Sequence, residues 1–436
     1  MARYHGAVKA AIIAALLVAS TEAGAAPARQ SQTTLHPGIV SELWVDSAIP
    51  ATIHLIEVDL TSAEIAVYAT KEQDKGITAS DYAQRVGAAV AINGDAFALA
   101  TYTPKGLAIG GTAVWSSTAD DATSAVFHFG RAGEVTQAAI EVPETVVGAT
   151  DLPEGTDGAV SGRPLLVRSG TATTQFDCND SVTLACQRAP RSAVGVSQGG
   201  DTMWLVVVDG WQQGSLGMTA AELAGFLQAR GAYMAMALDG GSSSALVLDG
   251  ALASSPSDGV ERTVANHIAV KYGALPKGEL YGLICKHSVV GCGTDSSRWI
   301  TGATVTLDDG RSVSSGTDAS YDFPNVTLRL ACVTVKKTGY LTKTQCRQVD
   351  QAGQLNYNSV AMFEGSDTPD AGVIDAPGTD PDAGSGLDGV PGDATPDRTD
   401  PGGCCDAGQS GGGSLMLAVA TAWFLRRRRG TTDVGT

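Results

Sequence analysis

The sequence predicts an α+β fold: a first domain built on a mixed β-sheet with a few packed helices, followed by a small all-β sandwich. Short apolar runs such as residues 90–92 and 205–208 end in Asn-Gly or Asp-Gly, which is typical of buried strands that end in turns. Residues 219–230 have the apolar spacing of a helix. After Pro276 short alternating strands such as residues 303–307 replace these runs and predict the sandwich.

The clearest local prediction is a helix followed by a strand. The helix should begin at Thr219, because Thr219 and Glu222 have the spacing of a capping box and apolar residues then recur at helical intervals. It should end near Gly231, which can take the left-handed conformation of a C′ residue. Residues 233–238 are too short and too evenly apolar for an amphipathic helix, so they predict a buried strand. The tip of that strand is the turn Asp239-Gly240-Gly241-Ser242.

Composition sets limits on the class of protein. The chain has 436 residues, 43% of them hydrophobic, which allows two or more domains with sizeable cores. The formal net charge is −17, and the segment 364–402 alone holds nine Asp and one Glu against Arg398. That segment is rich in Asp, Pro and Gly and predicts a disordered linker. The acidic balance argues against nucleic-acid binding, which relies on Lys and Arg to neutralise phosphates.

The N-terminus predicts a signal peptide over residues 1–25. Arg3 and Lys9 precede an apolar stretch over residues 10–19, and small residues follow at 23–25. The apolar stretch is shorter than the about 20 residues that a membrane-spanning helix needs. We therefore expect an exported protein that is secreted or held at the cell surface.

Six of the eight cysteines fall within the predicted folded regions. Export makes disulfides available to them, and three local bridges are the simplest of the fifteen pairings: 178–186, 285–292 and 332–346. No CxxC motif and no histidine pair at ligand spacing is present, so these cysteines do not indicate a metal site.

The predicted domains are residues 35–275 and 279–363. In the second, Gly302-Ala303-x-Val305-x-Leu307 precedes Asp318-x-x-Tyr321-x-Phe323 and Gly339-Tyr340. This pattern resembles the carboxypeptidase-regulatory-like modules of secreted bacterial enzymes, which implies an accessory role as a spacer or a glycan-contacting module.

Residues 403–436 form a distinct C-terminal tail. It contains Cys404-Cys405, an apolar run over residues 415–425, and the arginines 426–429. The tail resembles the sorting tails of myxobacterial surface proteins, which implies export and sorting machinery as partners, transient membrane association and removal of the tail. A plain membrane anchor is the alternative interpretation, although the apolar run is short for spanning a bilayer.

Four turns carry the chemistry of the first domain. They are Ile92-Asn93-Gly94-Asp95-Ala96-Phe97, Arg191-Ser192-Ala193-Val194-Gly195, Val208-Asp209-Gly210 and Leu238-Asp239-Gly240-Gly241-Ser242. Together with Gly217-Met218-Thr219 and Arg262-x-Val264-Ala265-Asn266, their order and spacing over about residues 88–271 resemble the phosphodiester glycosidase family. The resemblance implies hydrolysis of a sugar 1-phosphodiester to a free sugar and a phosphomonoester.

Two positions depart from the pattern of that family. Relatives usually read Ile-Asn-Gly-Gly-Phe-Phe, whereas this chain has Asp95 and Ala96 after Gly94. Relatives often read Asp-Gly-Arg, whereas Trp211 follows Gly210 here. The first change adds a carboxylate, and the second removes a cation that could bind phosphate.

The residue types suit cleavage of a glycosyl phosphate. Positive charge develops at the anomeric carbon and negative charge on the departing phosphate, so carboxylates and donors are both needed. We expect the catalytic carboxylates to be Asp239, Asp209 and Asp95. For the phosphate we expect a guanidinium fork, Arg191 with Arg163 or Arg262, and a backbone nest formed by Gly240, Gly241 and Ser242. Substrate hydroxyls would be bound by Asn93 and Asn266.

Several alternatives stay open at this level. Asp209 and Asn93 can equally hold turns, and Arg191 can be an ordinary surface arginine. Carboxylates near a phosphate can bind Ca²⁺ or Mg²⁺, although no fixed ligand spacing is visible and no metal-ligating residue is predicted. The first domain can also be a non-catalytic glycan-binding module of a surface protein, or a metal-dependent phosphodiesterase that cuts the other P–O bond.

Overall fold

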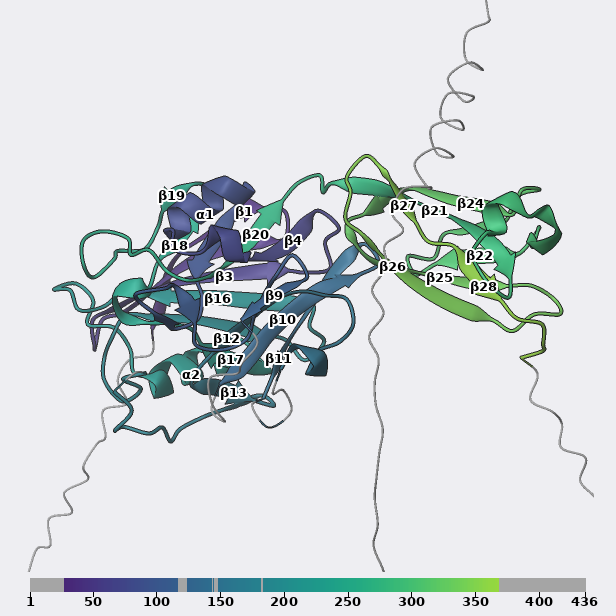
Figure 1. The fold of residues 1–436 in the computed structure, drawn as a ribbon. Helices are drawn as coiled ribbons and strands as arrows, with labels where there is room; N and C mark the ends of the chain where they lie inside the picture. Colours follow the sequence, from purple (N-terminus) through teal and green to yellow (C-terminus); the bar gives the residue numbers. More distant parts are fainter. Residues whose placement is uncertain (1–26, 117–123, 143, 145–147, 182, 368–436) are drawn as a thin grey trace, which may run out of the picture. The chain divides into compact units, whose positions relative to one another are not determined.

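The computed structural model describes residues 27–116, 124–142, 144, 148–181 and 183–367 (Figure 1). The predicted signal peptide, the predicted linker beyond residue 367 and the predicted C-terminal tail lie outside these ranges. Within them, no helix combines the length and the apolar character needed to cross a membrane.

The predicted α+β class with a mixed sheet is wrong, because the described residues are mostly strand. They contain two α-helices, α1 (Ala79–Val86) and α2 (Ala220–Gln228). The remaining helical segments are 3₁₀ turns: η1 (Glu72–Asp74), η2 (Ala149–Asp151), η3 (Gly241–Ser243), η4 (Cys292–Thr294) and η5 (Ser296–Arg298). All strand pairs described between residues 28 and 272 are antiparallel.

The largest sheet has eight strands. In spatial order they are β1 (Ala28–His36), β2 (Ile39–Asp46), β3 (Ala51–Asp59), β16 (Thr202–Val208), β15 (Arg191–Val196), β17 (Met234–Ala237), β13 (Leu165–Arg168) and β14 (Thr171–Ala172). Helix α2 packs against the β13, β14 and β17 end of this sheet. Its N-cap is Thr219, whose hydroxyl accepts from the Glu222 N–H while the Glu222 carboxylate accepts from the Thr219 N–H, which confirms the predicted capping box.

Two five-stranded sheets complete this part of the molecule, with a short β6 (Phe97–Ala98) and β7 (Thr103–Pro104) pair beside them. One sheet runs β11 (Val135–Glu141), β10 (Ala125–Ala132), β12 (Thr156–Gly162), β8 (Ala108–Gly110) and β9 (Ala113–Ser116). The other runs β19 (Ala251–Leu252), β18 (Leu246–Leu248), β5 (Val90–Asn93), β20 (His267–Tyr272) and β4 (Ile65–Ala69).

The apolar runs that suggested a mixed sheet have another cause. Along β16, Leu205 faces the largest apolar cluster, which all three sheets share, whereas Val206 faces a second cluster that includes α2. Along β5, Ile92 faces the shared cluster and Ala91 faces a smaller one formed with α1. These strands are therefore covered on both faces, as in parallel sheets, although their neighbours run antiparallel. The continuous apolar runs of β16 and β5 therefore indicate that both faces of each strand are buried, and they do not indicate the direction of the neighbouring strands.

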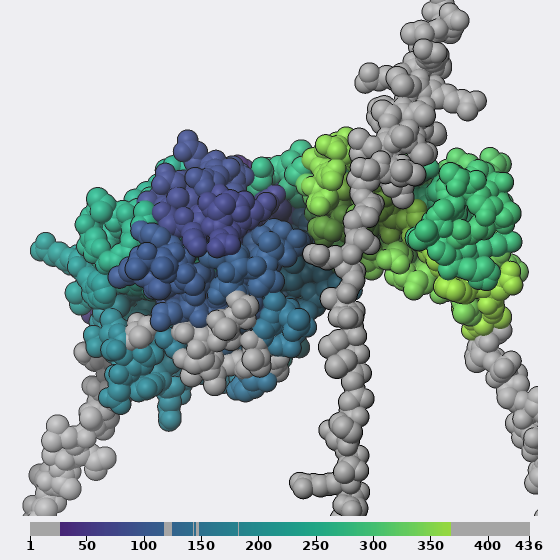
Figure 2. All heavy atoms as spheres, viewed as in Figure 1, coloured from purple at the N-terminus to yellow at the C-terminus, as the bar shows by residue number. Residues whose placement is uncertain are grey.

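The strands that follow residue 276 have an apolar cluster of their own. One sheet holds β24 (Ser320–Thr327), β21 (Lys277–Lys286) and β27 (Leu355–Tyr357), and β28 (Val360–Met362) also pairs with β21. The second holds β23 (Ser312–Ser314), β22 (Thr304–Leu307), β25 (Arg329–Lys336) and β26 (Lys343–Val349). These residues are drawn in green to yellow in Figures 1 and 2. Two sheets around one core agree with the predicted small all-β region, and the predicted domain limits stay predictions.

Three disulfides confirm the simplest cysteine pairing. The bridges are Cys178–Cys186, Cys285–Cys292 and Cys332–Cys346. Each closes a short loop or joins neighbouring strands.

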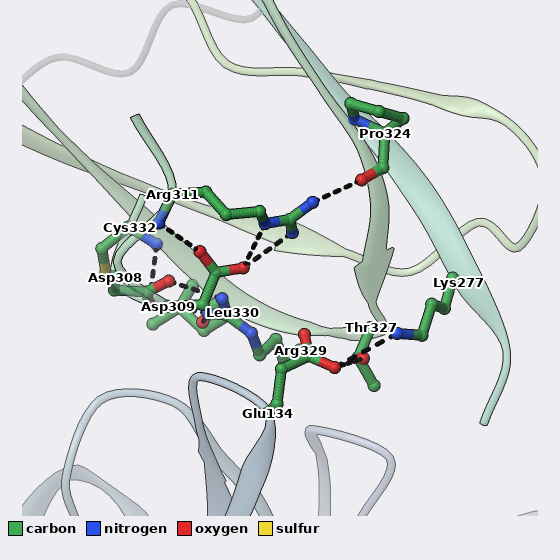
Figure 3. A network of polar contacts seen from close by, with 10 residues as sticks. All are labelled: Glu134, Lys277, Asp308, Asp309, Arg311, Pro324, Thr327, Arg329, Leu330 and Cys332. Atoms are coloured by element: carbon green, nitrogen blue, oxygen red, sulfur yellow. Dashed lines mark hydrogen bonds and ion pairs between the residues drawn. The ribbon is translucent and has the colours of Figure 1, made fainter. Parts of the chain in front are cut away.

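A polar network connects the turn between β10 and β11 to the later strands (Figure 3). Glu134 accepts hydrogen bonds from Thr327 Oγ1 at 2.8 Å and from Lys277 Nζ at 3.3 Å. Nearby, the fully buried side chain of Arg329 pairs with Asp308. The buried guanidinium is thus matched by a carboxylate, as burial of a charge requires.

Candidate active site

A cavity of about 300 Å³ opens where strand tips from different sheets meet. Two carboxylates line it, Asp95 after β5 and Asp239 after β17. The other side chains on which the chemistry depends are three arginines and a tryptophan: Arg163, Arg191, Trp211 and Arg262. The cavity therefore gathers two of the three predicted carboxylates and all three predicted arginines.

Asn93 fixes the tip of β17 against the tip of β5. Its side chain is buried and donates from Nδ2 to the Asp239 carbonyl at 2.7 Å. Its Oδ1 accepts from Ser192 Oγ at 2.6 Å and from the Ala245 N–H at 3.3 Å. In addition, the Asp239 N–H donates to the Gly94 carbonyl at 2.8 Å. The amide of Asn93 is thus engaged by protein groups, which favours a positioning role over the predicted contact with substrate.

Asp239 is half-buried at the end of β17. Its carboxylate accepts hydrogen bonds from the Ser243 hydroxyl and the Gly240 N–H, and Arg262 contributes a favourable charge. Burial outweighs these three effects and raises the pKa of Asp239 to about 6. This carboxyl therefore changes its charge close to neutral pH, which is characteristic of groups in functional sites.

The glycines after Asp239 serve packing as well as the turn. Gly241 has φ +61°, and a Cβ there would lie 2.9 Å from Cη2 of Trp211. The Gly241 N–H donates to the Pro190 carbonyl at 2.9 Å, and the Gly240 N–H serves the Asp239 carboxylate. Two of the three N–H groups predicted to form an anion nest therefore already have protein partners. The third member, Ser242, donates its hydroxyl to Asp258 at 2.6 Å.

Asp95 is buried and lines the cavity. Its Oδ2 accepts from the Gly106 N–H at 2.7 Å, and its own N–H donates to Asn266 Oδ1 at 2.7 Å. Asn266 also accepts from the Gly94 N–H through its carbonyl. Its Nδ2 is buried without a hydrogen-bond partner among the described residues. Asn266 thus holds the Gly94-Asp95 turn and does not itself line the cavity.

Arg191 is committed to the backbone. Its Nε donates to the Met218 carbonyl at 3.0 Å and Nη1 donates to Thr183 at 2.6 Å. Its Nη2 donates to Leu184 at 2.6 Å and to Gln187 at 2.8 Å. Burial lowers the pKa of Arg191 to about 10, which leaves it charged at neutral pH. Arg191 was predicted to bind the phosphate. Its guanidinium instead holds the segment that the Cys178–Cys186 disulfide closes, and it contributes its positive charge to the cavity.

Arg262 is the more accessible cation at the cavity mouth. Its side chain is 40% exposed, and Nη2 donates to Asp258 Oδ2 at 3.1 Å. Because Asp258 also accepts from Ser242, this segment is connected to the turn after β17. Arg262 is the arginine best able to turn toward a ligand.

Asp209 lies outside the cavity lining. Its Oδ2 contacts His54 Nε2 at 3.0 Å and its Oδ1 accepts from the Ser255 N–H at 2.8 Å. The carboxylate therefore joins β3 to the segment at residue 255, which leads toward Arg262. This geometry favours the turn-holding interpretation of Asp209.

Sequence reasoning did not assign a role to Trp211, which lines the cavity and is 49% exposed. The available signal was its position after Gly210 at the end of β16, next to a predicted site turn. Within the described residues, no group of three or more His, Cys, Asp or Glu side chains is arranged to hold a metal ion.

Comparison with known proteins adds to this geometry. Residues 86–271 match the phosphodiester glycosidase family. The matched segment runs from β5 into β20 and contains every residue that lines the cavity. The resemblance inferred from the four turns is therefore confirmed over nearly the expected residues. The resemblances proposed for residues 279–363 and for the tail stay predictions.

The similar proteins include the following three. The SPbeta prophage-derived uncharacterized protein YomE of Bacillus subtilis (strain 168) is 32% identical over 105 residues, which is 24% of this chain and 15% of that protein. A hypothetical protein from Synechocystis has a TM-score of 0.43 and 19% identity, over 57% of this chain and 64% of that one. The zebrafish N-acetylglucosamine-1-phosphodiester alpha-N-acetylglucosaminidase catalytic domain, auto-inhibited by its pro-peptide, has a TM-score of 0.40 and 21% identity, over 56% of this chain and 81% of that one.

Proposed function

We propose that this protein hydrolyses a sugar 1-phosphodiester in an extracellular or envelope glycan and releases the free sugar and a phosphomonoester. The observation that carries the proposal is the charge arrangement of one cavity, in which Asp239 and Asp95 face a space also lined by Arg163, Arg191 and Arg262. Carboxylates and guanidinium groups are both needed when a glycosyl phosphate separates into a cation-like sugar and a phosphate.

Asp239 is the carboxylate best suited to the reacting centre. A pKa of about 6 means that it is mostly ionised above that pH, where it can stabilise the oxocarbenium-like transition state or accept a proton from water. The departing group is a phosphate, which is a far better leaving group than a sugar hydroxyl. One carboxylate can therefore suffice, without a second group acting as a strong acid.

Asp95 has a different environment and a different role. The Gly106 N–H fixes one of its carboxylate oxygens, and Asn266 fixes its backbone. A carboxylate held in this way is suited to orienting substrate hydroxyl groups or a water molecule beside Asp239.

The arginines serve the phosphate. Arg191 supplies a fixed positive charge deep in the wall, and Arg262 supplies an accessible guanidinium at the mouth. A guanidinium is suited to phosphate oxygens because it can donate two parallel hydrogen bonds. Location outside the cytoplasm fits the three disulfides, which persist in oxidising compartments.

The decisive experiment compares Asp239→Asn with Asp249→Asn in the purified protein. Asp249 also precedes a glycine at a strand end, yet it is exposed and pairs with His36 away from the cavity. We expect the Asp239 variant to lose at least about a thousandfold in kcat/KM on sugar 1-phosphodiesters, and the Asp249 variant to match the parent. Equal activity of the Asp239 variant and the parent would contradict the proposed site.

Two further outcomes identify the competing functions. Binding of sugar phosphodiesters without any turnover by the parent would indicate a glycan-binding module. Turnover in ¹⁸O-labelled water distinguishes the two hydrolases: label in the sugar supports the glycosidase, and label in the phosphate indicates a phosphodiesterase.

A further inference from the structure

Trp211 has an unusual backbone for a large aromatic residue. It follows β16 in the turn Asp209-Gly210-Trp211 and has φ +55°, a left-handed conformation that bulky side chains rarely adopt. Such a conformation costs on the order of 1–2 kcal/mol and persists only where the surroundings impose it.

The surroundings do impose it here. Gly210 is pressed against Pro190, where an added Cβ would lie 2.4 Å from the proline nitrogen. The indole Nε1 donates to the Arg188 carbonyl at 3.1 Å. The six-membered ring lies over Gly241, since a Cβ on that glycine would be 2.9 Å from Cη2 and 3.2 Å from Cζ3. The ring is thus held at its nitrogen and at its far edge.

Burial of the side chain in an apolar core does not offset the strain of this turn. Trp211 is 49% exposed and belongs to none of the apolar clusters formed by the described residues, whereas Trp204 on the preceding strand is 5% exposed and packs with α2. A half-exposed indole that is held rigidly at the wall of a cavity is more consistent with contact to a ligand than with packing.

The chemistry of the ring defines what it can bind. Its one polar atom is already satisfied by Arg188, so the indole offers carbon to the cavity and no donor to a phosphate. The ring lies over Gly241, which is two residues beyond Asp239 in the chain. Ser243 belongs to the same turn, and its hydroxyl donates to the Asp239 carboxylate. Apolar surface and the carboxylate are therefore neighbours along the same turn.

We propose that the indole ring of Trp211 is the platform on which one C–H face of the substrate's pyranose ring packs, next to Asp239. This inference rests on the proposed function and specifies which part of the substrate lies where. A pyranose presents C–H bonds of slight positive charge on its faces, and these are attracted to the negative face of an aromatic ring. The phosphate then lies toward the arginines, away from the indole.

Kinetics test the platform. We expect Trp211→Ala to raise KM about 10- to 100-fold on sugar 1-phosphodiesters, with kcat changed less than about threefold, and Trp211→Phe to remain within about threefold of the parent in KM. Trp211→Gly should show the same KM defect as the alanine variant while removing the strained φ, which separates loss of the ring from misfolding. Leu216→Ala is the matched control, because Leu216 is exposed in the same loop but does not line the cavity. An unchanged KM in Trp211→Ala would overturn the proposal.

Binding gives a readout that does not require turnover. The indole ¹H–¹⁵N resonance of Trp211, assigned by its loss in Trp211→Phe, should shift on addition of α-D-glucose 1-phosphate or N-acetyl-α-D-glucosamine 1-phosphate. It should remain in place with inorganic phosphate or dimethyl phosphate. Equal shifts with all four probes, or no shift with any, would contradict a sugar platform.

The two proposals fail separately. If Asp239-dependent turnover is found and Trp211→Ala has the parental KM, the platform fails and the proposed function stands. If no sugar phosphodiester is hydrolysed but the Trp211 resonance responds to the sugar phosphates and not to phosphate, the proposed function fails and the platform stands.

Discussion

The side-chain amide of Asn93 donates a 2.7 Å hydrogen bond to the main-chain carbonyl of Asp239. The last residue of β5, in one sheet, therefore fixes the position of Asp239, which follows β17 in another sheet. Asn93 is buried and also accepts hydrogen bonds from Ser192 and the Ala245 N–H. The position of the candidate catalytic carboxylate is therefore determined by the junction of two sheets and not by the turn alone.

Replacing Asn93 with Ala should loosen this junction. The change leaves a carbonyl, a hydroxyl and an N–H without their partner, and each buried unsatisfied group costs about 1–3 kcal/mol. We expect the free energy of unfolding in urea to fall by about 2–4 kcal/mol and kcat to fall at least about tenfold. The exposed Asn179 supplies the control, since Asn179→Ala should change neither quantity. An Asn93 variant with parental stability would show that the junction does not depend on this amide.

Ionisation of Asp239 should make the protein less stable as the pH rises. Its folded pKa of about 6 lies above the ordinary value of 3.8, so the carboxyl ionises at a lower pH in the unfolded state than in the folded state. Between these two pH values, loss of the proton stabilises the unfolded state relative to the folded state. Stability from this group is full below about pH 4, declines up to about pH 6 and is level above. Asp239→Asn should therefore be more stable than the parent by about 1–3 kcal/mol at pH 7.5. The difference should be much smaller at pH 4, as measured by urea unfolding. A constant difference at both pH values would mean that the carboxyl titrates normally.

Arg191 and Arg262 should respond differently to substitution. Arg191→Lys removes most of four hydrogen bonds to backbone carbonyls, and a lysine cannot reproduce the fork. We expect it to lower the free energy of unfolding by about 2–4 kcal/mol. Arg262→Ala should leave Tm nearly unchanged and raise KM for the phosphodiester about tenfold, because Arg262 is accessible at the cavity mouth. Thermal unfolding and initial-rate kinetics of both variants check this contrast, and a large Tm loss in Arg262→Ala with no effect on KM would reverse the assignment.

Asp209 and Asp239 offer a second contrast. Asp209 contacts His54 and the Ser255 N–H and does not line the cavity, so Asp209→Asn keeps the shape and one acceptor. We expect its kcat/KM to fall less than about tenfold, against at least about a thousandfold for Asp239→Asn. Equal losses in the two variants would place Asp209 in the reaction after all.

Local sequence signals predicted the parts of the fold that depend on neighbouring residues. The capping box at Thr219 predicted the start of α2, and the short separation of Cys178 and Cys186 suggested their bridge. Strand direction could not be predicted in the same way. Val206 and Leu205 face different apolar clusters, and the apolar run that results is the same whether the neighbouring strand is parallel or antiparallel.

The candidate site shows the same division. The motifs identified Asp239, Asp95 and the three arginines as members of one site, and the structure brings them to one cavity. Their individual roles depended on contacts between distant residues. Arg191 donates hydrogen bonds to carbonyls of a disulfide-closed segment, and Asp209 contacts His54. No spacing in the sequence predicts either contact.

The surplus of guanidinium over carboxylate in the cavity has a practical consequence. With its two acids and three arginines ionised, the lining carries one net positive charge, and Asp258, the partner of Arg262, lies outside the lining. In the proposed reaction, the phosphomonoester left after cleavage carries about −1.5 to −2 at neutral pH, so electrostatics favour binding of the product over binding of the substrate. Turnover should therefore slow as product accumulates, and phosphate-buffered solutions would mask the activity that an assay in an uncharged or weakly coordinating buffer reveals.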